Sequence, residues 1–154
     1  LTHLNVSRNQ LTALPDTLGA LTGLTVLDAF SNKLTSLPDS IVALTQMKKL
    51  YLSGNKLTTL PKPIVKLTSL TVLNLGDNQL VTLPDSIAAL TALEDLRLSF
   101  NKLVTLPDSI AALTALKKLS LSTNPLAKPQ SPAVEAWLTA LRAGSCDVRM
   151  PFRW

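Results

Sequence analysis

The hydrophobic positions of the chain repeat with a constant period of twenty-three residues. The middle copy, residues 70–92, reads LTVLNLGDNQLVTLPDSIAALTA. Further copies begin at Leu1, Leu24, Met47 and Leu93, and a shorter sixth copy begins at Leu116. A constant period in the twenties is typical of a solenoid, in which each unit buries its apolar face only against its neighbours.

Each copy opens with a segment in which apolar and variable positions alternate. In residues 72–76, Leu73 and Leu75 point to one side and the other three residues point to the opposite side. Because the copies run in one direction and are joined by a return segment, the strands are expected to be parallel, with right-handed crossovers. The pattern predicts six short parallel strands in one sheet.

The return segment of each copy carries a leucine–proline pair. Its interior apolar positions in the middle copy are Leu80, Leu83, Ile87 and Leu90. Pro84 fits where the backbone leaves the sheet, because no donor is needed there and its φ suits the start of a helix. We expect Asp85 and Ser86 to cap a single α-helical or 3-10 turn over residues 87–90.

One asparagine recurs in every copy, at the point where the chain turns away from the strand. The six members are Asn9, Asn32, Asn55, Asn78, Asn101 and Asn124. A buried amide has both donors and an acceptor, so it can bond backbone groups that the turn leaves unpaired. The sequence predicts a structural asparagine ladder rather than a row of ligand-binding amides.

The repeat pattern ends after Leu126, and a different pattern follows. Ser131 and Pro132 resemble a helix N-cap and first residue, and apolar residues then recur at helical spacing up to Gly144. We expect residues 132–143 to form a capping helix whose Trp137 faces the core. The expected division is therefore residues 1–126 as repeats and residues 127–154 as cap helix and basic tail, and the tail either packs on the cap or leads into a further domain.

The motif LxxLxLxxNxLxxLPxxIxxLxx resembles the leucine-rich repeat in its twenty-three-residue form. In this sequence it covers Leu1 to about Leu126. It is similar to the repeats of intracellular Ras-suppressor, Scribble-like and plant Ras-group repeat proteins. The resemblance implies an α/β right-handed solenoid with strands on a concave face, short helical or 3-10 turns on a convex face and a protein partner.

Composition bears on the cellular setting. The chain has 154 residues, a net charge of +5 and one cysteine, Cys146, which has no partner for an intrachain disulfide. Secreted proteins of this size often carry disulfides, so the sequence favours the cytoplasm; a weak Asn5-Val6-Ser7 sequon favours secretion or the cell surface. The chain begins in register at Leu1 without a methionine, which suggests a piece of a longer protein.

Catalytic chemistry finds little support in the residues. The single histidine, His3, lies at one end of the chain and Cys146 at the other, so a Cys–His pair is not expected. No cluster of residues has metal-ligand spacing, and no glycine-rich phosphate loop is present. We therefore expect no enzyme activity, no metal and no cofactor.

The exposed strand positions are the better candidates for function, because like positions in successive copies stack into columns. Every aromatic residue within the repeats falls on this face: Phe30, Tyr51 and Phe100. Aromatic and arginine side chains dominate binding energy in protein interfaces. The predicted partner-binding residues are Asp28, Phe30, Lys49, Tyr51, Asp95, Arg97 and Phe100. Packing on the adjacent coils is the alternative interpretation of Phe30 and Phe100.

The sequence therefore predicts a non-enzymatic recognition module or scaffold that binds a protein on its concave face, in intracellular signalling, as a monomer. One alternative is a structural or targeting segment of a larger protein such as a kinase or GTPase. Another is a secreted effector or surface protein. A further alternative is electrostatic binding of nucleic acid or acidic membranes by lysine pairs such as Lys48-Lys49. Solubility is the favoured explanation of these positive charges.

Overall fold

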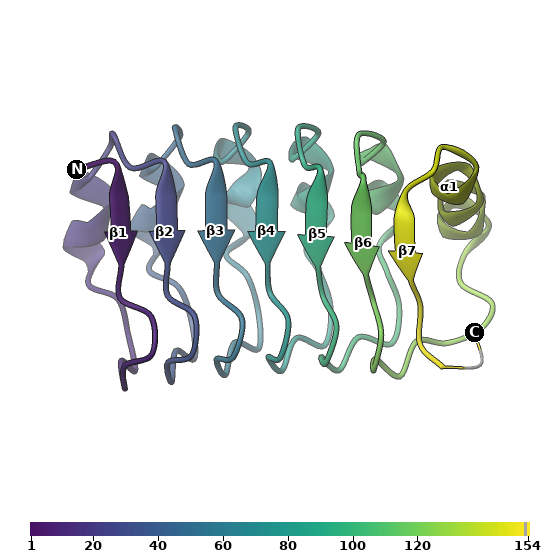
Figure 1. Cartoon of the computed structure of the whole chain (residues 1–154), viewed down its shortest axis with the longest axis horizontal. Coiled ribbons are helices and arrows are strands. Elements are labelled where there is room, and N and C mark those ends of the chain that lie inside the picture. Colours follow the sequence, from purple (N-terminus) through teal and green to yellow (C-terminus); the bar gives the residue numbers. More distant parts are fainter. Residues whose placement is uncertain (153) are drawn as a thin grey trace.

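Seven short strands lie side by side in one parallel sheet, in the order β1 to β7 along the chain. The computed structural model describes residues 1–152 and 154. The strands are β1 (His3–Asn5), β2 (Val26–Asp28), β3 (Lys49–Tyr51), β4 (Val72–Asn74), β5 (Asp95–Arg97), β6 (Lys118–Ser120) and β7 (Asp147–Arg149). The chain descends each strand in front, climbs back behind the sheet and advances one step, which is a right-handed path (Figure 1). The predicted fold class is confirmed.

Short 3-10 turns form the second layer, behind the strands (Figure 1). They are η1 (Asp16–Ala20), η2 (Asp39–Ala43), η3 (Lys62–Lys66), η4 (Asp85–Ala89) and η5 (Asp108–Ala112). The return segments of the fourth and fifth coils, residues 80–93 and 103–116, are identical in sequence. Their turns η4 and η5 have matching length and cap geometry.

The predicted side-chain caps of these turns are wrong. Pro84 occupies the N-cap of η4 in an extended conformation, and no side chain bonds to the turn. Instead, the Pro84 carbonyl accepts the Ile87 N–H at 3.0 Å, which satisfies the first donor of so short a turn. The Ser86 hydroxyl is buried without a hydrogen-bond partner among the described residues.

A continuous leucine-rich core fills the space between the sheet and the turns. In the fourth coil Leu73, Leu75, Leu80, Ile87 and Leu90 are all fully buried. The apolar periodicity predicts this set, because both the two-residue period of the strand and the wider spacing of the return point inward. The core is linear, so each coil depends on its neighbours for burial.

The asparagine side chains bridge adjacent coils. The Asn78 Nδ2 donates to the carbonyls of Leu52 and Leu75, at 3.0 and 3.1 Å, and its Oδ1 accepts the Leu57 N–H at 3.0 Å. Asn32, Asn55, Asn101 and Asn124 make the equivalent bonds. Asn9 is exposed, because the described structure has no coil before it.

The C-terminal helix α1 (Pro132–Ala143) covers the far end of the core, as predicted. The Ser131 hydroxyl accepts the Val134 N–H as N-cap. Trp137 faces the core, and its indole N–H donates to the Leu113 carbonyl at 3.0 Å. Gly144 is the C-cap of the helix, at the stop that the sequence predicts, and Ser145 after it is left-handed with a φ of 66°.

The tail contributes the seventh strand, one more than the six predicted. In β7, Asp147 N–H donates to the Lys117 carbonyl at 3.0 Å, and the Arg149 carbonyl accepts the Leu121 N–H at 2.7 Å. Asp147 pairs with Lys118, twenty-nine residues earlier instead of twenty-three. The longer spacing accommodates α1 in place of a 3-10 turn, and it hides this strand from a search at constant period.

Candidate partner-binding surface

The outward side of the sheet is a continuous surface of variable residues, which we call the strand face. It comprises the solvent-facing residues of β1–β7 and the second and third residues after each of β1–β6, such as Gly76 and Asp77 after β4. The strand register places Lys49 beside Val72, and Val72 beside Asp95. The same register places Tyr51 beside Asn74, and Asn74 beside Arg97, as the stacking of copies predicts. The columns therefore exist as expected.

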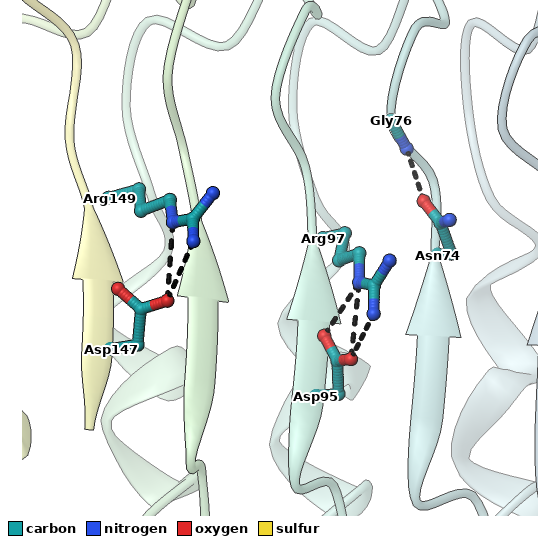
Figure 2. Close-up of polar contacts among 6 residues, drawn as sticks. All are labelled: Asn74, Gly76, Asp95, Arg97, Asp147 and Arg149. Carbon is teal, nitrogen blue, oxygen red and sulfur yellow. Dashed lines mark hydrogen bonds and ion pairs between the residues drawn. The ribbon is translucent and has the colours of Figure 1, made fainter.

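Asp95 and Arg97 form an ion pair within β5. The Arg97 Nη2 lies 2.7 Å from the Asp95 Oδ2, and the Arg97 Nε lies 3.0 Å from the Asp95 Oδ1 (Figure 2). The side chains are 40% and 18% exposed, respectively. The hydrogen bond that Arg97 donates to Asp95 raises the pKa of Arg97, against a smaller lowering by burial. Asp95 thus holds the guanidinium in a fixed orientation, and the Arg97 Nη1 makes no hydrogen bond with any of residues 1–152 or 154.

The tail strand repeats this arrangement two strands away. In β7 the Arg149 Nε and Nη2 each lie 3.2 Å from the Asp147 Oδ2 (Figure 2). The repeat period does not predict this pair, because it predicts no strand within residues 147–154. A local signal exists: Asp147-Val148-Arg149-Met150 repeats the alternation of Asp95-Leu96-Arg97-Leu98.

The last residues of β1–β6 form one column, and in three coils the side chain in this column accepts a hydrogen bond from the backbone of its own turn. The Oδ1 of Asn5, Asp28 and Asn74 accepts the N–H two residues later, from Ser7, Phe30 and Gly76, at 2.9, 3.0 and 3.2 Å. The predicted partner contact Asp28 therefore already stabilises its own turn. Tyr51, Arg97 and Ser120 occupy this column in β3, β5 and β6, and none of them makes this contact within the described part of the chain.

The aromatic residues differ in how well they are packed. Phe30 is 37% exposed, and the Arg8 guanidinium carbon lies 5.8 Å from its ring centroid. Tyr51 is half-buried and Lys49 is exposed. Phe100 is 58% exposed and has a φ of 59°. A bulky residue in this left-handed region costs about 1–2 kcal/mol, and so much exposure offers little packing in return.

Residues with catalytic potential are not brought together. The His3 Nδ1 lies 3.0 Å from the neighbouring Thr2 Oγ1, far along the solenoid from Cys146. Burial raises the pKa of the Cys146 thiol, with a smaller contribution from Asp147, and both effects disfavour a reactive thiolate. Within residues 1–152 and 154, no group of three His, Cys, Asp or Glu side chains could hold a metal ion. None of the helices in this range is long and apolar enough to cross a membrane.

Comparison with known proteins agrees with this architecture. A family model described as a leucine-rich repeat region matches residues 45–143, and another described as a leucine rich repeat matches residues 1–57. No curated protein matches the sequence. A solved structure of an LRR protein from Leptospira interrogans is similar, with a TM-score of 0.89 and 36% sequence identity. The match covers 97% of this chain and 37% of that one, so this chain spans little more than a third of its length. The chain belongs to the leucine-rich repeat family.

Proposed function

We propose that this protein is a non-enzymatic recognition module that binds a protein partner through its strand face. Leucine-rich repeat domains generally mediate protein–protein interaction, which supports this class of function. The observation that carries the proposal is the contrast between a nearly invariant interior and a strand face whose residues vary between coils.

The chemistry of the strand face suits a protein partner. It offers exposed aromatic surface at Phe30 and Phe100, and a pre-oriented guanidinium at Arg97. These residue types contribute most of the energy in many protein interfaces. Seven strands about 4.8 Å apart make a surface on the order of 29 Å long, which is enough for one side of a standard interface.

We also propose a cytoplasmic setting, in signalling or scaffolding of the kind served by Ras-suppressor and Scribble-like proteins, with the module acting as a monomer. The buried, free Cys146 supports a reducing compartment. A secreted or surface role is the second candidate, which the Asn5-Val6-Ser7 sequon favours.

The test is capture of partners from a lysate after photo-crosslinking, with wild type compared with a Tyr51→Ala/Arg97→Ala variant. We expect loss of at least one specific crosslinked protein, because both substitutions remove large contacts from the strand face. The matched control is Val81→Thr/Val104→Thr. These valines are exposed on the return segments, and Thr12, Thr35 and Thr58 occupy the equivalent positions of other coils. Unchanged capture by the first variant, with an intact circular dichroism spectrum, would contradict the proposal.

A further inference from the structure

The two positions that begin the turns of the fifth and sixth coils have backbone donors without acceptors. Ser99 and Ser122 follow β5 and β6 at the place where Gly76 follows β4. The Gly76 N–H donates to the Asn74 Oδ1 (Figure 2). Within the described residues, no acceptor bonds the N–H of Ser99 or of Ser122.

The missing acceptor has a plain cause in the sequence. Arg97 and Ser120 replace the asparagine or aspartate that bonds this N–H in the first, second and fourth coils. Because the coils share one geometry, the N–H of Ser99 faces the same side as that of Gly76, which is the strand face. A side-chain oxygen that the chain supplies itself in three coils is therefore open to an outside supplier in these two. The same holds at Ser53 of the third coil, where Tyr51 replaces the asparagine or aspartate, so the charges described next distinguish coils five and six.

The charges around this place favour an anionic oxygen. Arg97 holds in the fifth coil the strand position that Asn74 holds in the fourth, and its guanidinium is turned toward Asp95, which engages its Nε and Nη2. Lys118 lies between the two arginine strands, in register with Asp95 and Asp147, and no ion pair joins it to either carboxylate in the described part of the chain. Arg97, Lys118 and Arg149 together exceed these two carboxylates by one positive charge. Arginine with nearby backbone N–H groups is a strong receptor for a carboxylate.

An apolar contact lies on the same coil. Phe100 directly follows Ser99, and more than half of its side chain is exposed in a left-handed conformation. A partner whose carboxylate is bound beside Arg97 can place a neighbouring aliphatic side chain on this ring. The fourth coil is unsuited to the same role, because Asn74 already fills its donor and Asp77 adds a negative charge there.

We propose that Arg97, Ser99 and Ser122 form a carboxylate-binding site for an extended protein segment in which Asp or Glu lies next to an apolar residue. The proposal rests on the strand face being the partner-binding surface. It adds the chemical class of the partner segment and its position on coils five and six. The bound carboxylate is that of a side chain, not of a chain terminus.

The probe is an acetylated, amidated hexapeptide of alternating glutamate and leucine, titrated into ¹⁵N-labelled protein at physiological salt. We expect the amide signals of Ser99 and Ser122 to move more than that of Gly76. A peptide with glutamine in place of glutamate should bind about tenfold more weakly, because it loses charge-assisted hydrogen bonds. Equal binding of the two peptides, or no movement of these amides, would overturn the proposal, as would an equal response to inorganic phosphate.

Two variants separate the donors from the charge. Ser120→Asn places a carboxamide where Asn74 stands and keeps every charge, and we expect about tenfold weaker peptide binding as one N–H is filled. Arg97→Asn removes the guanidinium and fills the Ser99 donor, so it should bind still more weakly. The matched control is Lys102→Gln, which lies off the strand face where the fourth coil has Gln79, and it should bind normally. Normal peptide binding by Ser120→Asn and Arg97→Asn would refute the site.

The outcomes distinguish this site from the broader function. If Tyr51→Ala/Arg97→Ala loses its captured partner but the acidic peptide fails to bind the wild type, the strand face remains the interface and the carboxylate site is refuted. If the peptide binds as expected and capture is unaffected by that variant, the proposed function is refuted instead.

Discussion

The first and last coils have the same strand geometry but different hydrogen bonding and burial. In the first coil, Leu1 is 71% exposed, and Asn9 donates only to the Val6 and Ser7 carbonyls of its own coil. In the sixth coil, the core is covered by α1, and Asn124 also bonds the previous coil through the Leu98 carbonyl and the Leu103 N–H. The same residue type thus stabilises the fold by different amounts, according to the neighbour it bridges.

The C-terminal cap supplies polar partners as well as apolar cover. The Gln130 Oε1 accepts the Leu106 N–H at 2.8 Å, and its Nε2 donates to the carbonyls of Val104 and Ala127. This pattern matches that of the ladder asparagines, but it lies on the return segment. A solenoid end therefore needs its exposed backbone groups satisfied in addition to its leucines buried.

The largest difference in stability between the two ends is expected when the apolar cover of the sixth coil is removed. Trp137→Ala should lower the free energy of unfolding by about 3–5 kcal/mol, since it opens a cavity and leaves the Leu113 carbonyl without its indole donor. Urea denaturation followed by circular dichroism measures the effect. The control is Leu1→Ala, which should change stability by less than about 0.5 kcal/mol; similar losses in both variants would contradict the contrast.

The asparagine ladder can be tested by one substitution at two places. Asn78→Ala should cost about 1–3 kcal/mol, because it strands buried backbone groups of two coils. Asn9→Ala should cost less than about 0.5 kcal/mol, because its partners face solvent. Chemical denaturation of both variants gives the comparison, and equal costs would show that the bridge between coils is not the source of stability.

The polar part of the cap is tested by Gln130→Ala. We expect a loss of about 1–2 kcal/mol in unfolding free energy, as the Leu106 N–H and Val104 carbonyl lose their partners. Hydrogen exchange should speed up first at Leu106. The matched control, Gln79→Ala, changes a half-buried glutamine on the fourth coil and should leave exchange at Leu106 unchanged.

The smallest expected effect has the opposite sign. Phe100→Gly should stabilise the fold by up to about 1 kcal/mol, because glycine adopts a positive φ without strain. Gly54 holds this position in the third coil, with a φ of 68°. Thermal unfolding measures the gain, and capture of the partner should be weakened at the same time. A destabilised variant would show that the Phe100 ring packs more than its exposure indicates.

Much of this architecture is predictable because a solenoid repeats its physics. Alternation in residues 72–76 identifies the buried leucines, and the constant period predicts which residues share a column. The constant period does not predict the seventh strand, because α1 lengthens the coil that precedes it. The prediction that Asp85 caps the turn is wrong, because Pro84 occupies the N-cap position and its carbonyl accepts the Ile87 N–H.

The strand face is predictable in its membership but not in its bonding. Outward alternation is enough to place Tyr51 and Arg97 on it. The bond from the Gly76 N–H to Asn74, and its absence at Ser99, depend on side-chain conformation, which hydrophobic periodicity does not describe. The ion pair by which Asp95 orients Arg97 likewise depends on side-chain conformation and does not follow from the sequence pattern.

The identical return segments of coils four and five allow the module to change length without redesign. Recombination between residues 80–93 and 103–116 deletes or adds one whole coil, and the joined sequence is unchanged across the junction. Deletion would bring Asn74 beside Ser120 and remove Arg97 and Ser99 together. One event can thus add or remove a strand together with its binding residues, while the pattern of buried core residues stays the same.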